Sequence, residues 1–261
     1  MLTNTQSIVS TIVFNQVCPP RLWWSEDITQ VCIDGETLAL DAFRSGIKRL
    51  LEKAWELYDS IAGKGNRFAD NLPKNFKDDL LDNTNGYSFL ADGPYTQAPG
   101  ALLDRIMRTC NLTLLDGEGR FSWDRMAVHA LFATFDKLNA ILSVLTYILP
   151  CPSTRITEFL DHKLRNASRN RNLHMLGGEM FLLARYHKMT NITGYDICIP
   201  AFYPGVLQEL TLEIFAGGLR EVEIYLASVV FGSDAINNYS TLVRPSWPFS
   251  PPPPLKLWNT H

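Results

Sequence analysis

The sequence has few of the patterns that indicate a secreted or a metal-binding protein. Its five cysteines are odd in number and no two have Cys-x-x-Cys spacing, so neither a zinc site nor a disulfide framework is expected. The N-terminal stretch lacks a basic start and a long apolar core, which argues against a signal peptide. We therefore expect a nuclear or cytoplasmic protein that is not secreted and has no cofactor and no bound metal.

Motifs of the common nucleotide-binding and hydrolytic sites are also absent. The chain has no Walker A sequence, no Gly-x-Gly-x-x-Gly, no Gly-x-Ser-x-Gly and no His-Glu-x-x-His. A net charge of −3 excludes a wholly basic nucleic-acid coat. The longest apolar stretch, 126–149, contains His129, Asp136 and Lys137, which would be costly in lipid. We expect this stretch to be a buried helix, and we expect no membrane partner.

Signals for hairpins and helices are present and predict the fold class. Asp34-Gly35 and Gly177-Gly178 each separate two short apolar stretches, which is a strong local signal for a β-hairpin. The expected strands are 29–33, 37–40, 173–176, 180–186 and 197–201. Apolar spacing and capping residues predict helices at 3–18, 42–62, 74–82, 100–110, 123–148 with Ser122 as N-cap, 155–165, 204–216 and 218–230. The expected fold class is mainly α with a small antiparallel β-sheet (α+β).

A local excess of positive charge lies between Arg155 and Lys188, which we call the basic segment. It holds seven cationic and three anionic residues in a chain whose net charge is −3. The cations are Arg155, Lys163, Arg165, Arg169, Arg171, Arg185 and Lys188. Such a concentration of charge suits a phosphate-bearing partner; the alternative is a solvated basic surface balanced by acidic neighbours.

Three patterns in the basic segment have both a functional and a purely structural interpretation. Arg155 begins an expected helix, where it can reach a phosphate or pair with the Glu158 carboxylate. Lys188 follows the end of a strand, where a lysine can bind an anion or simply keep a turn soluble. His162 and Arg165 are three residues apart, so on a helix both could face one anion. Spacing alone leaves these alternatives open.

Several stretches of the sequence resemble a single family. They are PPRLWWSEDITQVCIDGETLAL, NTNGYSFLADGP, TRITEFLDHKLRN, RNLHMLGGEMFLLARYHKMTNITGYDICIPAFYP and REVEIYLASVVFGSDAINNYST. Together they resemble the tyrosine-recombinase-like region of a group of fungal proteins associated with mobile elements or telomeres. Some of those proteins are fused to RecQ-type helicases or zinc fingers. The resemblance covers roughly residues 7–242.

The resemblance implies the chemistry of DNA integration and recombination. It also implies helices, then a three-stranded sheet, then further helices. In this family an arginine in an Arg-x-x-Glu pattern binds the scissile phosphate, a role that falls to Arg155 with Glu158. A lysine in the turn between the second and third strands protonates the leaving oxygen, which corresponds to Lys188. Fixed cations of this kind stabilise the charge that develops on phosphate oxygens.

The chain departs from the family in the residues that complete catalysis. The family needs a later His-x-x-Arg and then a nucleophilic Tyr, whereas the only histidine after the third expected strand is His261. Tyr225 and Tyr239 come too early in the chain for the nucleophile. We therefore expect a truncated, catalytically incompetent recombinase-like protein with no catalytic residue.

DNA binding led by phosphate contacts is the expected function. The expected DNA-binding side chains are Arg155, Lys188, Arg165, Arg169, Arg171 and Arg185, with Glu158 in support. The alternatives are an accessory or interaction protein, such as a gene-cluster relic with no nucleic-acid role, or an enzyme completed by a partner chain.

The expected organisation has three parts. Residues 1–122 form a helical region with a β-hairpin, comparable to the core-binding domain of the family. Residues 123–242 form a partial catalytic domain. Residues 243–261 form a Pro-rich disordered tail, whose four consecutive prolines favour polyproline II and make it the candidate site for a protein partner.

Overall fold

The computed structural model describes most of the chain between residues 22 and 231. The described residues are 22–65, 67, 78–90, 99–115, 117–150, 159, 162–168, 170–186 and 197–231. Their contacts divide the chain into two compact units, residues 1–52 and 53–261. The predicted helix at 3–18 and the Pro-rich tail at 243–261 lie outside the described residues.

The first unit contains a three-stranded antiparallel sheet. Its strands are β1 (Leu22–Trp24), β2 (Gln30–Ile33) and β3 (Glu36–Ala39), with β2 in the centre. Asp34 and Gly35 have φ angles of 50° and 90°, as both central residues of a type I′ turn require, and the predicted hairpin is confirmed. The sequence did not predict β1, because three residues are too few to show an alternating pattern.

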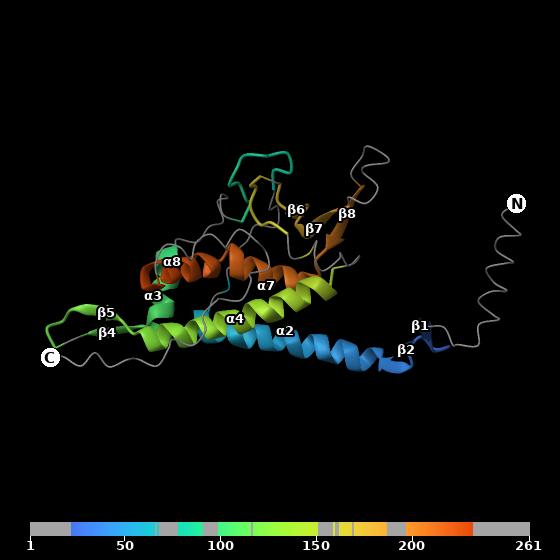
Figure 1. Cartoon of the computed structure of the whole chain (residues 1–261), viewed down its shortest axis with the longest axis horizontal. Coiled ribbons are helices and arrows are strands. Elements are labelled where there is room, and N and C mark those ends of the chain that lie inside the picture. The colour runs from blue at the N-terminus through green and yellow to red at the C-terminus, as the bar shows by residue number, and fades with distance from the viewer. Residues whose placement is uncertain are drawn as a thin grey trace, which may run out of the picture. The chain divides into compact units, whose positions relative to one another are not determined.

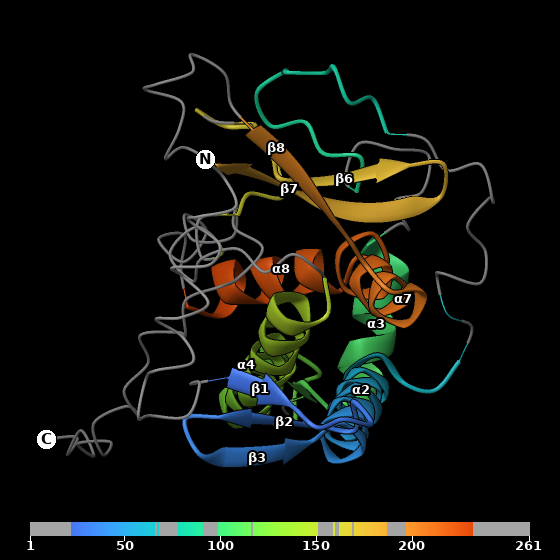
Figure 2. The same cartoon turned by 90° about the vertical axis from the view of Figure 1, so that its right-hand side faces the viewer.

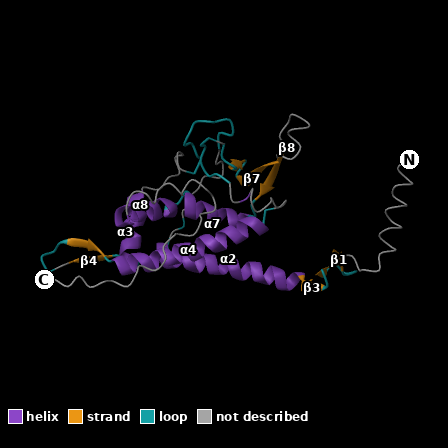
Figure 3. Cartoon of the chain, in the orientation of Figure 1, coloured by secondary structure: helices purple, strands orange, loops and turns teal. Residues whose placement is uncertain are grey.

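Helices are the main secondary structure in the described part of the second unit (Figure 3). They are the C-terminal part of α2 (Leu40–Ala62), which begins in the first unit, and α3 (Pro99–Thr109), α4 (Arg125–Ile148), α7 (Gly205–Phe215) and α8 (Leu219–Phe231). α4 contacts α7 and α8, and α3 contacts α8 (Figure 1). The helices predicted at 42–62, 100–110, 123–148, 204–216 and 218–230 are therefore confirmed, with small differences at their ends.

α4 supplies much of the core of the second unit. Phe135, Leu138, Leu142 and Leu145 are buried and recur at three- or four-residue spacing, which places them on one helix face. Among the described helices, α4 is the one long and apolar enough to cross a membrane by length and composition. Its contacts with α7 and α8 are those of a core helix, as the sequence predicted.

The N-terminus of α4 differs from the prediction. The N-cap is Asp124, whose carboxylate accepts hydrogen bonds from the backbone nitrogens of Met126 (2.9 Å) and Ala127 (3.1 Å). Ser122, the predicted cap, lies two residues too early to reach these nitrogens. It belongs instead to a short antiparallel hairpin that the sequence did not predict. The strands of this hairpin are β4 (Thr113–Leu115) and β5 (Phe121–Trp123).

The basic segment contributes two strands to a second three-stranded antiparallel sheet. The strands are β6 (Leu173–Leu176), β7 (Glu179–Tyr186) and β8 (Ile197–Phe202), with β7 in the centre. Gly177 and Gly178 join β6 to β7 with φ angles of 62° and 89°, so this turn is also of type I′. The hairpin and the third strand agree with the prediction from the sequence.

α7 supports one end of this sheet through a single glutamine. The Gln208 side chain donates a hydrogen bond to the Gly178 carbonyl oxygen (2.8 Å) and accepts one from the Met180 backbone nitrogen (2.9 Å). Figure 2 shows α7 beside the strands, in agreement with the contacts between α7 and β7. The sheet is thus fixed to the helical core at its β6–β7 turn.

Two predicted helices differ from the structure. Residues 78–82 of the helix predicted at 74–82 are not helical, because the Asp79 and Asp82 side chains bind backbone nitrogens two residues ahead and favour turns. Residues 162–165 of the helix predicted at 155–165 are not helical either. The Lys163 backbone instead donates a hydrogen bond to Asn172 Oδ1 and accepts one from the Asn172 backbone nitrogen.

The structure is a mixed α+β fold with small antiparallel sheets, which agrees with the coarse fold class predicted. The predicted division near residue 122 does not coincide with the observed one at residues 52 and 53. α3 lies before residue 122 and contacts α8, so residues on both sides of the predicted boundary share one core.

Candidate functional site

A buried ion pair lies beside the second sheet and joins two segments that are far apart in the sequence. The Arg171 guanidinium, two residues before β6, donates a hydrogen bond from Nη2 to Asp78 Oδ1 at 2.6 Å. The two side chains are 1% and 0% exposed. Arg171 also donates to the carbonyl oxygens of Asp79 (2.8 Å) and Asp82 (3.2 Å). One arginine therefore holds three points of the loop 78–90 against the sheet.

His174 and Tyr87 complete the surroundings of this pair. His174 Nδ1 lies 3.5 Å from Asp78 Oδ2, and its Nε2 lies 3.1 Å from the Arg171 carbonyl oxygen. The Tyr87 hydroxyl donates to Asp78 Oδ1 at 3.3 Å, and the Arg171 guanidinium lies 4.6 Å from the centre of the Tyr87 ring. We call Asp78, Tyr87, Arg171 and His174 the Asp78 cluster.

The charge of Asp78 is stabilised by this arrangement. Burial raises the pKa of the Asp78 carboxyl, but hydrogen bonds from His174 and Arg171 and the Arg171 charge hold that pKa below its ordinary value of 3.8. The backbone nitrogen of Met175 adds a hydrogen bond to Oδ2 at 3.3 Å. A carboxylate with a lowered pKa stabilises the folded state above its unfolded pKa and loses that contribution as the pH falls through its folded pKa.

Acidification below about pH 4 is therefore expected to lower the free energy of unfolding, and Asp78→Asn is expected to flatten this part of the profile. Urea unfolding between pH 7 and pH 2.5 measures both curves. Asp104→Asn, on a carboxylate that is 56% exposed, serves as the matched control and should keep the wild-type slope. If the free energy of unfolding falls equally with acid in wild type and in Asp78→Asn, Asp78 is not the group whose protonation lowers stability.

Two asparagines fix the chain that leads into β6. The Asn166 side chain donates to the carbonyl oxygens of Asp82 (2.7 Å) and Thr84 (3.2 Å), and its backbone bonds with Gly86 and Tyr87. The Asn172 side chain accepts a hydrogen bond from the Lys163 backbone nitrogen and donates one to the Leu183 carbonyl oxygen of β7. The Asn172 backbone also forms hydrogen bonds with the backbones of Lys163 and Leu183. Asn166 and Asn172 thus connect this part of the chain to the loop 78–90 and to the sheet.

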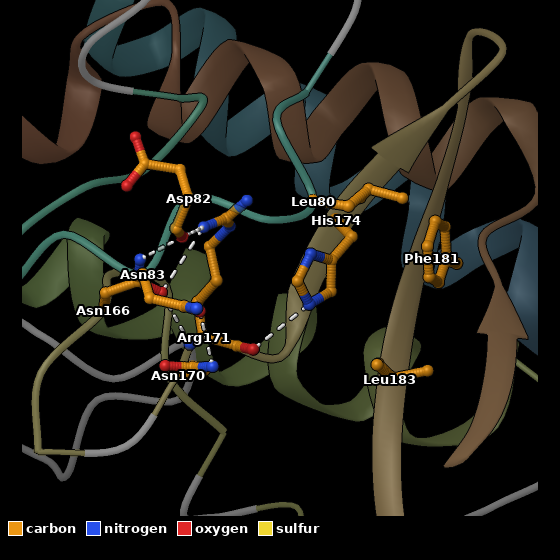
Figure 4. Close-up of a pocket in the computed structure, with 9 residues that line it drawn as sticks. All are labelled: Leu80, Asp82, Asn83, Asn166, Asn170, Arg171, His174, Phe181 and Leu183. Atoms are coloured by element: carbon orange, nitrogen blue, oxygen red, sulfur yellow. Dashed lines mark hydrogen bonds between the residues drawn. The ribbon is translucent and has the colours of Figure 1, made fainter.

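A cavity of about 110 Å³ opens beside the Asp78 cluster. Figure 4 shows Phe181 and Leu183, both from β7, on one side of the His174 ring, and Asn170 and Arg171 on the other. The Phe181 ring stacks on His174 with centroids 5.6 Å apart and planes inclined by 26°. The cavity therefore has an aromatic and aliphatic wall facing a wall of amides.

A second buried ion pair lies among the helices. Arg220, at the start of α8, donates to Glu223 Oε2 at 3.0 Å and to Asn139 Oδ1 of α4 at 3.2 Å. The Arg220 and Glu223 side chains are 4% and 2% exposed. Burial raises the pKa of Glu223 although the Arg220 charge opposes the shift. The pair therefore carries a net desolvation penalty.

The structure places the predicted DNA-binding residues in different environments. Arg155, Glu158, Arg169 and Lys188 lie outside the described residues. Arg185 lies in β7, where its backbone pairs with Cys198, and its side chain is outside the described part of the structure. The predicted convergence of Arg155 and Lys188 on one phosphate therefore stays a prediction.

Two of the predicted DNA-binding arginines make internal contacts. The prediction that Arg171 binds DNA is wrong, because its guanidinium is buried against Asp78 and is not exposed to a phosphate outside the protein. Arg165 donates to Glu221 Oε1 of α8 at 3.1 Å, with the two side chains 38% and 40% exposed. It also donates to the Gly86 carbonyl oxygen at 3.3 Å. Arg165 is thus partly accessible and Arg171 is not.

His162 and Arg165 do not share a helix face, because the residues between them are not helical. His162 is 3% exposed and its ring meets the Phe159 ring edge-on at 5.6 Å. This position is that of a core histidine, whereas Arg165 reaches the surface.

Sequence reasoning missed Asp78, Tyr87 and His174. No local motif includes them, because Asp78 lies 93 residues before its arginine. The one available signal was the position of Arg171 directly before a predicted apolar strand, where an unpaired charge would be costly. Among the residues that the structure describes, no group of three or more His, Cys, Asp or Glu side chains could hold a metal ion.

Comparisons of this chain with protein-family models, with curated proteins and with solved structures find no match.

Proposed function

We propose that this chain is a recombinase-like protein that binds DNA through phosphate contacts and does not cleave it. The supporting observation is the order of elements around the basic segment. A long helix, α4, precedes the segment; the antiparallel strands β6 and β7 lie within it; and β8, α7 and α8 follow it. This is the order that the family resemblance implies. In the sequence, Lys188 belongs to the connection between Tyr186 at the end of β7 and Ile197 at the start of β8.

The cations assigned to DNA in this proposal are Arg155, Arg165, Arg169, Arg185 and Lys188. Arg171 is left out, because its charge is used internally by Asp78. Phosphate contacts position a protein on DNA and carry little sequence information, so binding is weakly specific and sensitive to salt. Cleavage is not assigned, because this chain has no His-x-x-Arg after the second sheet.

The double variant Arg155→Ala/Lys188→Ala is expected to bind duplex DNA about tenfold more weakly than wild type at low salt. Its slope of log affinity against log salt concentration is expected to become shallower by about 2, because two phosphate contacts are lost. Fluorescence anisotropy titrations at several salt concentrations measure both quantities.

Arg108→Ala/Arg120→Ala is the matched control, since it removes two cations that are 76% and 72% exposed and lie outside the basic segment. It should bind as wild type does. The proposal fails if wild type shows no binding at low salt, or if the Arg155/Lys188 variant keeps the wild-type affinity and salt slope.

An interaction protein without a nucleic-acid role is the second candidate. The observation that favours it is the internal pairing of Arg171 with Asp78 and of Arg165 with Glu221, which offsets part of the positive charge of the basic segment. This candidate predicts no salt-dependent DNA binding by wild type. The titration described above therefore separates the two candidates.

A further inference from the structure

We propose that the cavity beside β6 and β7 receives one unstacked pyrimidine base. The inference deepens the proposed function and rests on it, since the natural source of such a base is a single-stranded part of the bound DNA. It assigns a base-binding role to residues that the phosphate contacts do not involve.

The size of the cavity selects a single ring. Its volume is about 110 Å³. An apolar cavity of about 150 Å³ is known to admit benzene, so this smaller, open cavity has room for at most one six-membered ring, and a fused purine is too large. The opening to solvent lets the sugar and the phosphates of the strand stay outside.

The apolar wall offers a surface for stacking. Phe181, Leu183 and His174 line the cavity, and the Phe181 ring lies in a row with its cross-strand neighbours His174 and Phe202, with ring centroids 5.6 and 5.4 Å away. An aromatic ring that is fixed by its neighbours loses little conformational freedom when it binds a flat ligand. Stacking on aromatic side chains is the usual way in which proteins hold unpaired bases.

The opposite wall offers a donor and an acceptor side by side. Asn170 Nδ2 donates to Asn83 Oδ1 at 2.8 Å. This pairing uses one group from each amide, so one amide nitrogen and one amide oxygen remain for a ligand, whichever way round the two amides are oriented. Adjacent donors and acceptors match the edge of a pyrimidine base. Arg171 Nε adds a buried donor without a hydrogen-bond partner among the described residues.

Among its described lining residues, the cavity offers an anion no free cation. Arg171 is the arginine that lines it, and its charge is already paired with the buried Asp78 carboxylate. A neutral base needs no such cation, and the Asp82 carboxylate points away from the other lining side chains (Figure 4). The phosphates of the strand are better placed outside, near Arg165, which reaches the surface.

The test uses the full chain and three labelled single strands of equal length: oligothymidylate, oligoadenylate and an abasic strand. Wild type is expected to bind oligothymidylate roughly tenfold more tightly than the abasic strand, with oligoadenylate close to the abasic value. Asn170→Ala should reduce oligothymidylate binding to within about twofold of the abasic strand and leave the abasic affinity unchanged. Phe181→Leu, which keeps an apolar side chain in the sheet, should have the same selective effect. Arg165→Ala is the contrasting variant and should weaken all three strands alike.

Two outcomes overturn the inference in distinguishable ways. If the three strands bind equally and in a salt-sensitive way, the base site is ruled out and the proposed DNA binding stands. If no strand binds, the DNA proposal fails, and ligand-observed NMR with thymidine decides the cavity separately. Thymidine binding that is seen with wild type and lost with Asn170→Ala would then support a base site for a free nucleoside. If wild type does not bind thymidine, the base site is rejected.

Discussion

Arg171→Met is expected to lower the free energy of unfolding by about 3–5 kcal/mol. The variant keeps most of the apolar stem of the side chain and removes the guanidinium, so it leaves the Asp78 carboxylate buried without its cation. The Asp79 carbonyl oxygen also loses its hydrogen bond from the guanidinium, and the Asp82 carbonyl oxygen and the Asn166 side-chain oxygen each lose one of two donors. Urea unfolding followed by circular dichroism at neutral pH measures the loss.

Arg165→Met is the matched control for this prediction. It removes an arginine from the same segment, but its partner Glu221 is 40% exposed and can be hydrated, so the expected loss is below about 1 kcal/mol. The double variant Asp78→Asn/Arg171→Met should cost less than the sum of the two single variants, because the pair acts as one unit. Equal losses for Arg171→Met and Arg165→Met would show that Asp78 does not depend on Arg171.

Arg220→Met is expected to destabilise the helical core by a similar amount, about 3–5 kcal/mol, because it leaves the buried Glu223 carboxylate without the Arg220 cation. Adding Glu223→Leu should recover at least half of this loss. The raised pKa of Glu223 indicates that burial penalises its charged form, so an apolar pair of similar volume avoids a cost that the wild type bears. The Asn139 oxygen then lacks its donor, which keeps the recovery incomplete.

Thermal and urea unfolding of the single and double variants give the comparison. Arg108→Met, on an arginine that is 76% exposed, controls for the loss of a positive charge and should change stability by less than about 1 kcal/mol. A double variant that is less stable than Arg220→Met alone would show that Glu223 stabilises the core independently of Arg220.

The parts of the fold that the sequence predicted well are those whose cause is local. Asp34-Gly35 and Gly177-Gly178 impose type I′ turns on their own neighbours, so both hairpins were predicted with nearly the observed strand bounds. The short strand β1 and the hairpin β4–β5 were missed, because three residues give too weak an alternation. The helix predicted at 74–82 failed at its C-terminal part, where Asp79 and Asp82 bind nearby backbone nitrogens.

The candidate site could be predicted only in part, because its main contact is non-local. Counting charges along the basic segment treated Arg171 as a surface cation, since its counter-ion Asp78 belongs to a different part of the chain. A local count cannot detect a partner that arrives through folding. The positions of Arg155 and Lys188 still depend on the family resemblance, and the DNA titration tests them.

The distance in sequence between Asp78 and Arg171 also bears on the order of events during synthesis. The chain emerges from the ribosome with residue 78 first, and 93 more residues must follow before its arginine exists. Until then the loop 78–90 lacks its contact with Arg171. Closing so long a span has an entropic cost that the hairpin at Gly177-Gly178 does not have. The contact between Asp78 and Arg171 should therefore form after the β6–β7 turn, whose two strands are adjacent in the sequence.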